Sequence, residues 1–177
     1  MCGAAAREKE HGVSEHDSAI ALVNALEAWG ATHVVWLPCT ETQHLHQGLA
    51  RSRLCSVPVC REGEAIPVAI GLYAGGKKPV VVIQNTGFFE SGDSIRGLAI
   101  PMHMPLPLVI GYRGYRRDAP MTDTAAIYLE PILKTWGITY YLIDPPDEGR
   151  IQAALQESWD KSCPVAVLLP EAGAVSR

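Results

Sequence analysis

The feature that most constrains the fold is a regular alternation of short apolar runs with segments of helical periodicity. Residues 80–83, Val-Val-Val-Ile, form a continuous β-branched run, which is typical of a parallel strand covered on both faces. Between such runs, apolar residues recur at helical spacing, as Ala19, Leu22 and Leu26 do. Six strands are predicted in this way, at residues 33–37, 56–60, 80–83, 108–112, 139–143 and 165–169.

The segments between these strands predict the helices. The expected helices follow Ser14 up to Trp29, and then cover residues 42–52, about 63–73, Glu90 or Ser94 to Ile100, 125–136 and 147–160. Strands that alternate with helices favour a parallel sheet with right-handed crossovers. We therefore predict an α/β fold: a three-layer, doubly wound sheet of six parallel strands with helices on both faces.

The chain is expected to form one domain. Residues 1–13 are small and charged without periodicity, so we predict a disordered lead, followed by a single domain over residues 14–177. Hydrophobic residues make up 47% of the chain, which is slightly apolar and suggests a sizeable surface for a protein partner. The net charge of −4 argues against nucleic-acid binding.

The sequence also indicates a compartment. No apolar run reaches about 18 residues, so a membrane span is not expected. The five cysteines form no Cys-x-x-Cys pair. We expect a cytoplasmic protein with reduced thiols.

Glu62 stands where a strand is predicted to end and a helix to begin. In open α/β sheets, ligands collect at the carboxyl ends of the strands. A carboxylate there either stabilises the helix start or acts as an acid or base. Glu64 lies two residues further on, so the two side chains are expected to point in different directions.

Other candidates have simpler explanations. Residues 71–77, Gly-Leu-Tyr-Ala-Gly-Gly-Lys, match the start of a P-loop, but Lys78 stands where Ser or Thr should follow, and the segment leaves a helix instead of a strand. We interpret it as a helix end and turn. His44 and His46 are two apart on a predicted helix and do not share a face, so they are a poor metal pair. Either could still point into a cleft beside Cys39, where a thiolate could be favoured.

Several stretches together resemble a known family. Residues 61–65, Arg-Glu-Gly-Glu-Ala, with Gly71 and then residues 76–79, Gly-Lys-Lys-Pro, look like the pyrimidine-binding (PYR) domain of thiamine-diphosphate enzymes. Three further stretches narrow the likeness to sulfopyruvate decarboxylase alpha subunits and the N-terminal halves of phosphonopyruvate decarboxylases. They are residues 35–39 (Val-Trp-Leu-Pro-Cys), 84–87 (Gln-Asn-Thr-Gly) and 110–114 (Ile-Gly-Tyr-Arg-Gly).

The resemblance implies a cofactor site and an activity. Glu62 would hydrogen-bond the aminopyrimidine ring and activate thiamine diphosphate for decarboxylation of a 2-oxo acid. Carboligation of an acyl acceptor is the alternative fate, and a non-catalytic PYR-like scaffold is a second alternative. The residues implied to contact the cofactor are Pro38, Cys39, Glu62, Asn85, Thr86 and Gly87. Those implied to face the substrate are Thr40, His44, Phe88 and Arg113.

The resemblance also implies a partner. The family binds diphosphate and Mg²⁺ through a Gly-Asp-Gly stretch and a later Asn in a separate domain, and residues 92–94, Gly-Asp-Ser, do not match it. No metal ligands are therefore expected in this chain. A pyrophosphate-binding (PP) subunit would hold the diphosphate and Mg²⁺, in a heterotetramer or larger complex.

One loop departs from the family pattern. After Gln-Asn-Thr-Gly the family usually continues Leu-Gly-Asn, whereas this chain has Phe88, Phe89 and Glu90, with Asp93 close behind. Two aromatic and two acidic residues there are expected to reshape the pocket and to oppose a dianionic sulfonate or phosphonate.

Overall fold

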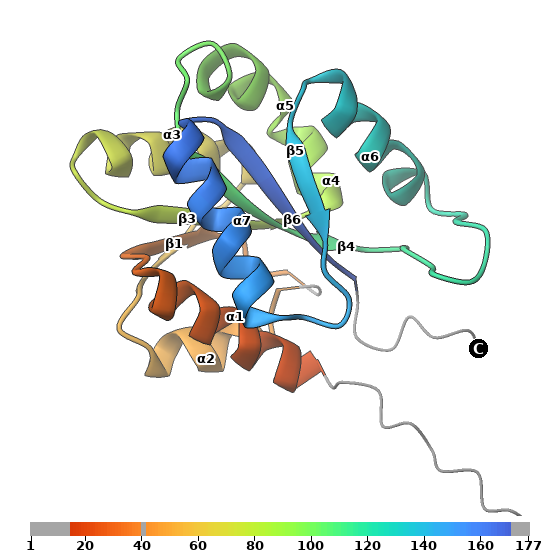
Figure 1. Ribbon diagram of the computed structural model, residues 1–177, viewed down its shortest axis with the longest axis horizontal. Coiled ribbons are helices and arrows are strands. Elements are labelled where there is room, and N and C mark those ends of the chain that lie inside the picture. Colours follow the sequence, from red (N-terminus) through yellow and green to blue (C-terminus); the bar gives the residue numbers. More distant parts are fainter. Residues whose placement is uncertain (1–14, 40–41, 171–177) are drawn as a thin grey trace, which may run out of the picture.

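A sheet of six parallel strands with helices on both sides forms the body of the protein (Figure 1). The computed structural model describes residues 15–39 and 42–170. The predicted α/β class and the doubly wound parallel sheet are confirmed. The predicted lead over residues 1–13, the cap at Ser14 and the candidate Thr40 lie outside the described residues.

The elements alternate along the chain much as predicted. Their bounds are α1 (Glu15–Trp29), β1 (His33–Trp36), α2 (Leu45–Arg51), β2 (Cys55–Pro58), α3 (Glu62–Ala74), β3 (Pro79–Gln84), α4 (Asn85–Glu90), α5 (Gly92–Ser94), the π-helix η1 (Ile95–Ala99), β4 (Leu106–Tyr112), α6 (Thr124–Thr135), β5 (Thr139–Leu142), α7 (Glu148–Lys161) and β6 (Pro164–Pro170).

The strand order creates a switch point in the middle of the sheet. The order is β2-β1-β3-β4-β6-β5, so the chain moves outward from β1 to β2 and then crosses to the other side of β1 to form β3. Val34 and Val35 of β1 pair with Val80 and Val81 of β3 in parallel register. After β1 the chain continues to β2 on one side of this pair, whereas after β3 it continues to β4 on the other side. In open α/β sheets the crevice that binds ligands lies outside such a switch point, which here is at the carboxyl ends of β1 and β3.

Two cores cover the two faces of the sheet. Val80 and Val82 of β3 pack with α1, α2 and α7, whereas Val81 and Ile83 pack with α3, α4, η1 and α6. All four of these side chains are buried, as predicted for a central strand covered on both faces. In Figure 1, α1 and α2 lie together on one side of the sheet and α6 lies on the other.

The main error in the predicted boundaries concerns the end of β3. In this part of the chain no helix was predicted before Glu90 or Ser94. Instead Gln84 is the extended residue before α4, and the helix begins at once with Asn85. This places Asn85, Thr86 and Gly87 on the first turn of a helix. By contrast, the P-loop-like stretch is the predicted helix end: α3 stops at Ala74, and Gly76 adopts φ +75° in the turn that follows.

Among the described residues, none of the helices combines the length and apolar character needed to cross a membrane.

Candidate functional site

The carboxyl ends of three neighbouring strands bring most of the candidate residues together. Pro38 and Cys39 come after β1, Glu62 begins α3 after β2, and Asn85 begins α4 directly after β3. Because these strands are adjacent and parallel, all of their carboxyl ends meet at the same end of the sheet. The site therefore lies at the switch point, where open α/β sheets bind ligands.

Glu62 packs directly against the backbone of Gly87. A Cβ atom added at Gly87 would lie 2.3 Å from Cγ of Glu62 and 2.6 Å from its Oε1. Atoms that are not bonded cannot approach this closely, so only glycine leaves room for the Glu62 side chain. Glu62 is half-buried in this contact.

Glu64 has a different environment from Glu62. Its side chain is exposed, and Oε2 accepts a hydrogen bond from the Cys60 N–H at 3.3 Å. The two acids therefore point in different directions, as their spacing predicted. Only Glu62 reaches the start of α4.

The first turn of α3 has an unusual set of partners. Its N-cap residue, Arg61, makes no capping hydrogen bond through its side chain. Glu90 supplies the missing acceptor, because its carboxylate accepts the N–H of Gly63 and also binds Nη2 of Arg61 at 2.5 Å. Pro67 lies beyond the first turn, since α3 begins at Glu62, and it cannot donate to the Gly63 carbonyl. The Ser94 hydroxyl donates to that carbonyl instead, at 3.5 Å.

Ion pairs offset the two acidic residues among residues 88–93, which belong largely to α4 and α5. Glu90 is paired with Arg61, and Asp93 is paired with Arg96 at 2.6 Å. Each acid is therefore offset by a neighbouring guanidinium. The expected opposition to a dianionic substrate is correspondingly reduced.

Asn85 links the ends of β3 and β4. It is fully buried, its Nδ2 donates to the Arg113 carbonyl at 2.8 Å, and its Oδ1 accepts the Thr86 N–H at 3.0 Å. A buried amide that is satisfied on both sides has little freedom to reorient. Asn85 thus fixes the entry into α4 and the position of Gly87.

Phe88 does not reach the crevice. Its side chain is fully buried on the far side of α4, with ring centroids 5.5 Å from Trp136 and 6.0 Å from Phe89. The expected substrate contact is therefore not supported, and Phe88 is part of the hydrophobic core. The helix that begins at Asn85 explains this, because one residue after Gly87 the side chain turns toward the sheet.

Arg113 follows β4 and is directed toward α6. Its Nε donates to Oδ2 of Asp123 at 3.1 Å, and 40% of the side chain remains exposed. Asp123 caps α6 by accepting the Ala125 N–H. The Ala125 N–H and then the Arg113 guanidinium lower the pKa of Asp123. Gly114 permits the close approach, since it has φ +77° and an added Cβ would lie 2.5 Å from Cβ of Asp123.

A compact turn holds the segment after β1. Oγ1 of Thr42 donates to the Leu37 carbonyl at 2.6 Å and accepts the Cys39 N–H at 3.0 Å. The Cys39 thiol lies 3.4 Å from the same hydroxyl and is half-buried, whereas Pro38 is exposed. Sequence reasoning missed Thr42. A threonine that follows a strand end by a few residues is the signal that could have suggested such a turn.

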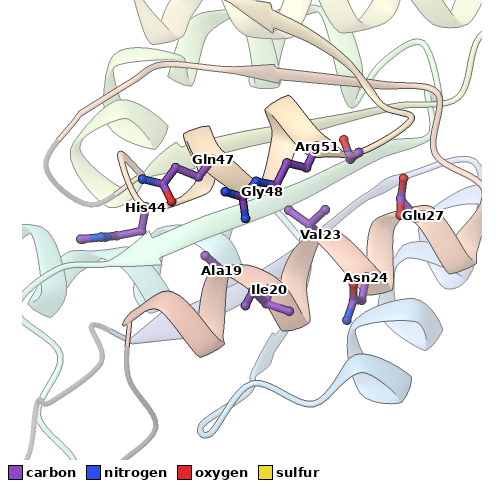
Figure 2. A pocket seen from close by; sticks show the side chains of 10 residues that line it. Ala19, Ile20, Val23, Asn24, Glu27, His44, Gln47, Gly48 and Arg51 are labelled. Carbon is purple, nitrogen blue, oxygen red and sulfur yellow. The ribbon is translucent and has the colours of Figure 1, made fainter.

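The two histidines are separated, as expected from their spacing. His46 is exposed beside Trp36, with ring centroids 6.4 Å apart. His44 lies at one end of a pocket of about 210 Å³ between α1 and α2, which Val23, Gln47 and Arg51 also line (Figure 2). Neither Glu62 nor Gly87 lines that pocket. His44 is thus on the flank of the domain.

A second polar cluster lies at the end of β4. The buried Tyr112 hydroxyl donates to the Ala126 carbonyl at 3.2 Å and to Oε1 of Glu130 at 3.1 Å, and Tyr140 donates to Oε2 of Glu130 at 2.6 Å. Burial and then the Glu130 carboxylate raise the pKa of Tyr112 well above its ordinary value. This cluster joins β4, β5 and α6. Within the described residues, no group of three His, Cys, Asp or Glu side chains is placed to hold a metal ion.

Comparison with known proteins agrees with this arrangement. Residues 17–114 match the family described as thiamine pyrophosphate enzyme, N-terminal TPP binding domain. The sulfopyruvate decarboxylase subunit alpha of Methanocaldococcus jannaschii is 28% identical over 153 residues, covering 84% of this chain and 90% of that protein. The phosphonopyruvate decarboxylase of Streptomyces viridochromogenes is 29% identical over 156 residues, covering 85% of this chain but 39% of that longer protein.

Solved structures show the same fold. A split-gene transketolase, described as an inactive beta4 tetramer, superposes with a TM-score of 0.66 at 16% identity, covering 92% of this chain and 53% of that one. The benzoylformate decarboxylase of Polynucleobacter necessarius also gives a TM-score of 0.66, at 12% identity, and covers 96% of this chain and 35% of its own. The match over residues 17–114 establishes that the chain belongs to the family of thiamine pyrophosphate enzyme N-terminal TPP-binding domains.

Proposed function

We propose that this chain is the pyrimidine-binding subunit of a split thiamine-diphosphate-dependent 2-oxo acid decarboxylase. The observation that carries the proposal is the contact between Glu62 and Gly87 at the switch point of the sheet. The contact places a half-buried carboxyl at the end of the sheet where ligands bind in this fold class. The named decarboxylases among its relatives support the reaction class.

The residues present fit the pyrimidine end of the cofactor. Glu62 offers a carboxyl that can hold or move a proton at the pyrimidine ring nitrogen. Gly87 leaves room for the Glu62 side chain against the first turn of α4. Thr86 stands on the same turn, and Pro38 and Cys39 lie on the β1 side of the crevice.

Each residue of this chain then has a separate task. Thiamine diphosphate, when bound, supplies the electron sink that decarboxylation of a 2-oxo acid requires. Glu62 orients the pyrimidine and exchanges a proton with it. Asn85 holds the first turn of α4 in place through its bonds to Thr86 and to the Arg113 carbonyl.

We propose that a partner subunit holds the diphosphate and Mg²⁺. Two kinds of relative support this division. The matched proteins of Methanocaldococcus jannaschii and Methanococcus maripaludis are named alpha subunits, and the longer sulfopyruvate decarboxylase of Methanosarcina acetivorans is matched over 39% of its length. The complement would be a pyrophosphate-binding subunit, in a heterotetramer or larger assembly.

The substrate is proposed to be a 2-oxo acid with a second anionic group. The relatives' names indicate sulfonate and phosphonate groups. The pairing of Glu90 with Arg61 and of Asp93 with Arg96 is compatible with an anionic ligand near the loop. Arg113, which is partly exposed at the end of β4, is the proposed contact.

The test is reconstitution with the partner. The chain would be co-expressed with a candidate subunit that carries Gly-Asp-Gly and a later Asn, and the complex screened with 2-oxo acids for release of carbon dioxide. Release that depends on thiamine diphosphate and Mg²⁺ is the expected result. Carbon dioxide release together with a product in which a new carbon–carbon bond joins the remaining acyl group to an acceptor, in place of the free aldehyde, would instead identify a carboligase. A complex that binds no cofactor would identify a scaffold and overturn the proposal.

A further inference from the structure

The residues on both sides of Glu62 are held by one carboxylate from another helix. Glu90 is the last residue of α4, and its carboxylate accepts the Gly63 N–H and binds Nη2 of Arg61. Arg61 and Gly63 are the immediate neighbours of Glu62 in the chain. A single side chain, 28 residues away in sequence, therefore fixes the backbone before and after the proposed catalytic acid.

The contact between α4 and α3 has two points. Gly87 lies against the Glu62 side chain, and Glu90 lies against Gly63. Positions three apart on a helix share a face, so Gly87 and Glu90 present one surface of α4 to the first turn of α3. Two points of contact fix both the distance and the rotation of that turn relative to α4.

Gly63 also packs closely against the Glu90 carboxylate. A Cβ added there would lie 2.8 Å from Oε2 of Glu90 and 3.1 Å from Oε1. The Glu90 carboxylate thus occupies the space that a side chain at this position would need. Arg61 and Gly63 therefore both bind Glu90, Arg61 through an ion pair and Gly63 through its backbone N–H.

We infer that Glu90 is a positioning residue for Glu62, an inference that rests on the proposed function. Glu90 serves as the N-cap that α3 does not obtain from Arg61. By holding the first turn against α4, it sets where the Glu62 carboxyl stands in the crevice. Its removal leaves the Glu62 carboxyl intact but displaced, and small displacements of a reacting group are costly to the rate.

The first arm of the test uses the chain alone and needs no cofactor. The readout is hydrogen exchange of the Gly63 amide, followed by NMR. In Glu90→Ala we expect its protection to fall by about tenfold or more, since the amide loses its acceptor. Asp93→Ala is the matched control: it removes a nearby acid whose side chain is 92% exposed and which pairs with Arg96. It should leave Gly63 unchanged.

The second arm uses the complex with the partner subunit. The readouts are the exchange rate of the cofactor C2 proton and the dissociation constant of the cofactor. In Glu90→Ala we expect the exchange rate to fall about 10–100-fold while cofactor affinity stays within about threefold. Glu90→Gln keeps an acceptor for Gly63 and should recover much of the rate, which a loss of general stability would not do.

The outcomes separate this inference from the proposed function. If Glu62→Gln slows C2 exchange but Glu90→Ala does not, or if Gly63 keeps its protection in Glu90→Ala, the positioning role is overturned and the proposed function stands. If Glu90→Gln is as slow as Glu90→Ala, an acceptor at this position is not what matters, and the role is again overturned. If the wild-type complex shows no C2 exchange, both fail together.

Discussion

The Cγ atom of Glu62 lies 2.3 Å from the position that a Cβ atom would take at residue 87. The Glu62 side chain can therefore adopt this position only because residue 87 is glycine. Glu62 begins α3 after β2, and Gly87 lies in the first turn of α4 after β3; β1 lies between these two strands. Their contact joins the two sides of the switch point. The position of the Glu62 carboxyl thus depends on the absence of a side chain at residue 87.

Gly87→Ala is expected to displace Glu62. The added methyl overlaps the Glu62 side chain, so C2 proton exchange in the complex should fall by about 10²-fold. Gly71→Ala is the matched control, because Gly71 also lies in a helix but has no atoms within 4 Å of an added Cβ. It should stabilise the fold by about 0.5–1 kcal/mol without loss of rate. Equal rates in the two variants would show that the contact has no role.

Asn85→Ala is expected to lower stability. The change removes a buried amide that bonds the Arg113 carbonyl and the Thr86 N–H, and leaves both groups unsatisfied. The free energy of unfolding, measured by urea denaturation, should fall by about 1–3 kcal/mol. A loss below a few tenths of a kcal/mol would mean that water replaces the amide freely.

Asp123 is expected to make stability depend on pH in the acid range. Its folded-state pKa is lowered, chiefly by the Ala125 N–H, so its contribution is present above the unfolded pKa of about 3.9 and is lost as the pH falls through the folded value. Asp123→Ala should cost about 1 kcal/mol at neutral pH, the usual value of a helix cap. The difference from wild type should shrink below about pH 4. A difference independent of pH down to the acid transition would contradict this.

The isolated chain is expected to bind thiamine diphosphate weakly. Glu62 and its neighbours fit the pyrimidine end, whereas the diphosphate and Mg²⁺ are proposed to lie on the partner. Calorimetry should therefore show Mg²⁺-dependent binding only after the partner is added. Tight, Mg²⁺-dependent binding by the chain alone would contradict the proposed division of the site.

The sequence was sufficient for the architecture because apolar periodicity determines it directly. The buried run Val80 to Ile83 and the helical segment after Glu62 both appear where periodicity placed them. Family resemblance then selected Glu62 and Gly87, which the structure brings into contact although they are 25 residues apart.

The predictions were wrong for residues whose surroundings depend on contacts between distant parts of the chain. The family resemblance implied that Phe88 faces the substrate, but the helix that begins at Asn85 turns its ring into the core. Glu90 was expected to repel an anion, but its partners Arg61 and Gly63 lie on another helix. No local pattern in the sequence indicates such a long-range pairing.

The most direct test of the account compares Glu62→Gln with Glu64→Gln in the assembled complex. Glutamine keeps the size and a hydrogen bond but cannot exchange a proton, so the matched substitutions differ only in position. We predict that C2 proton exchange slows by about 10²–10⁴-fold in Glu62→Gln. In Glu64→Gln, whose side chain is exposed and directed to Cys60, the rate should change little. A slow Glu64→Gln with a normal Glu62→Gln, or no slowing in either, would contradict the central claim that Glu62 activates the cofactor.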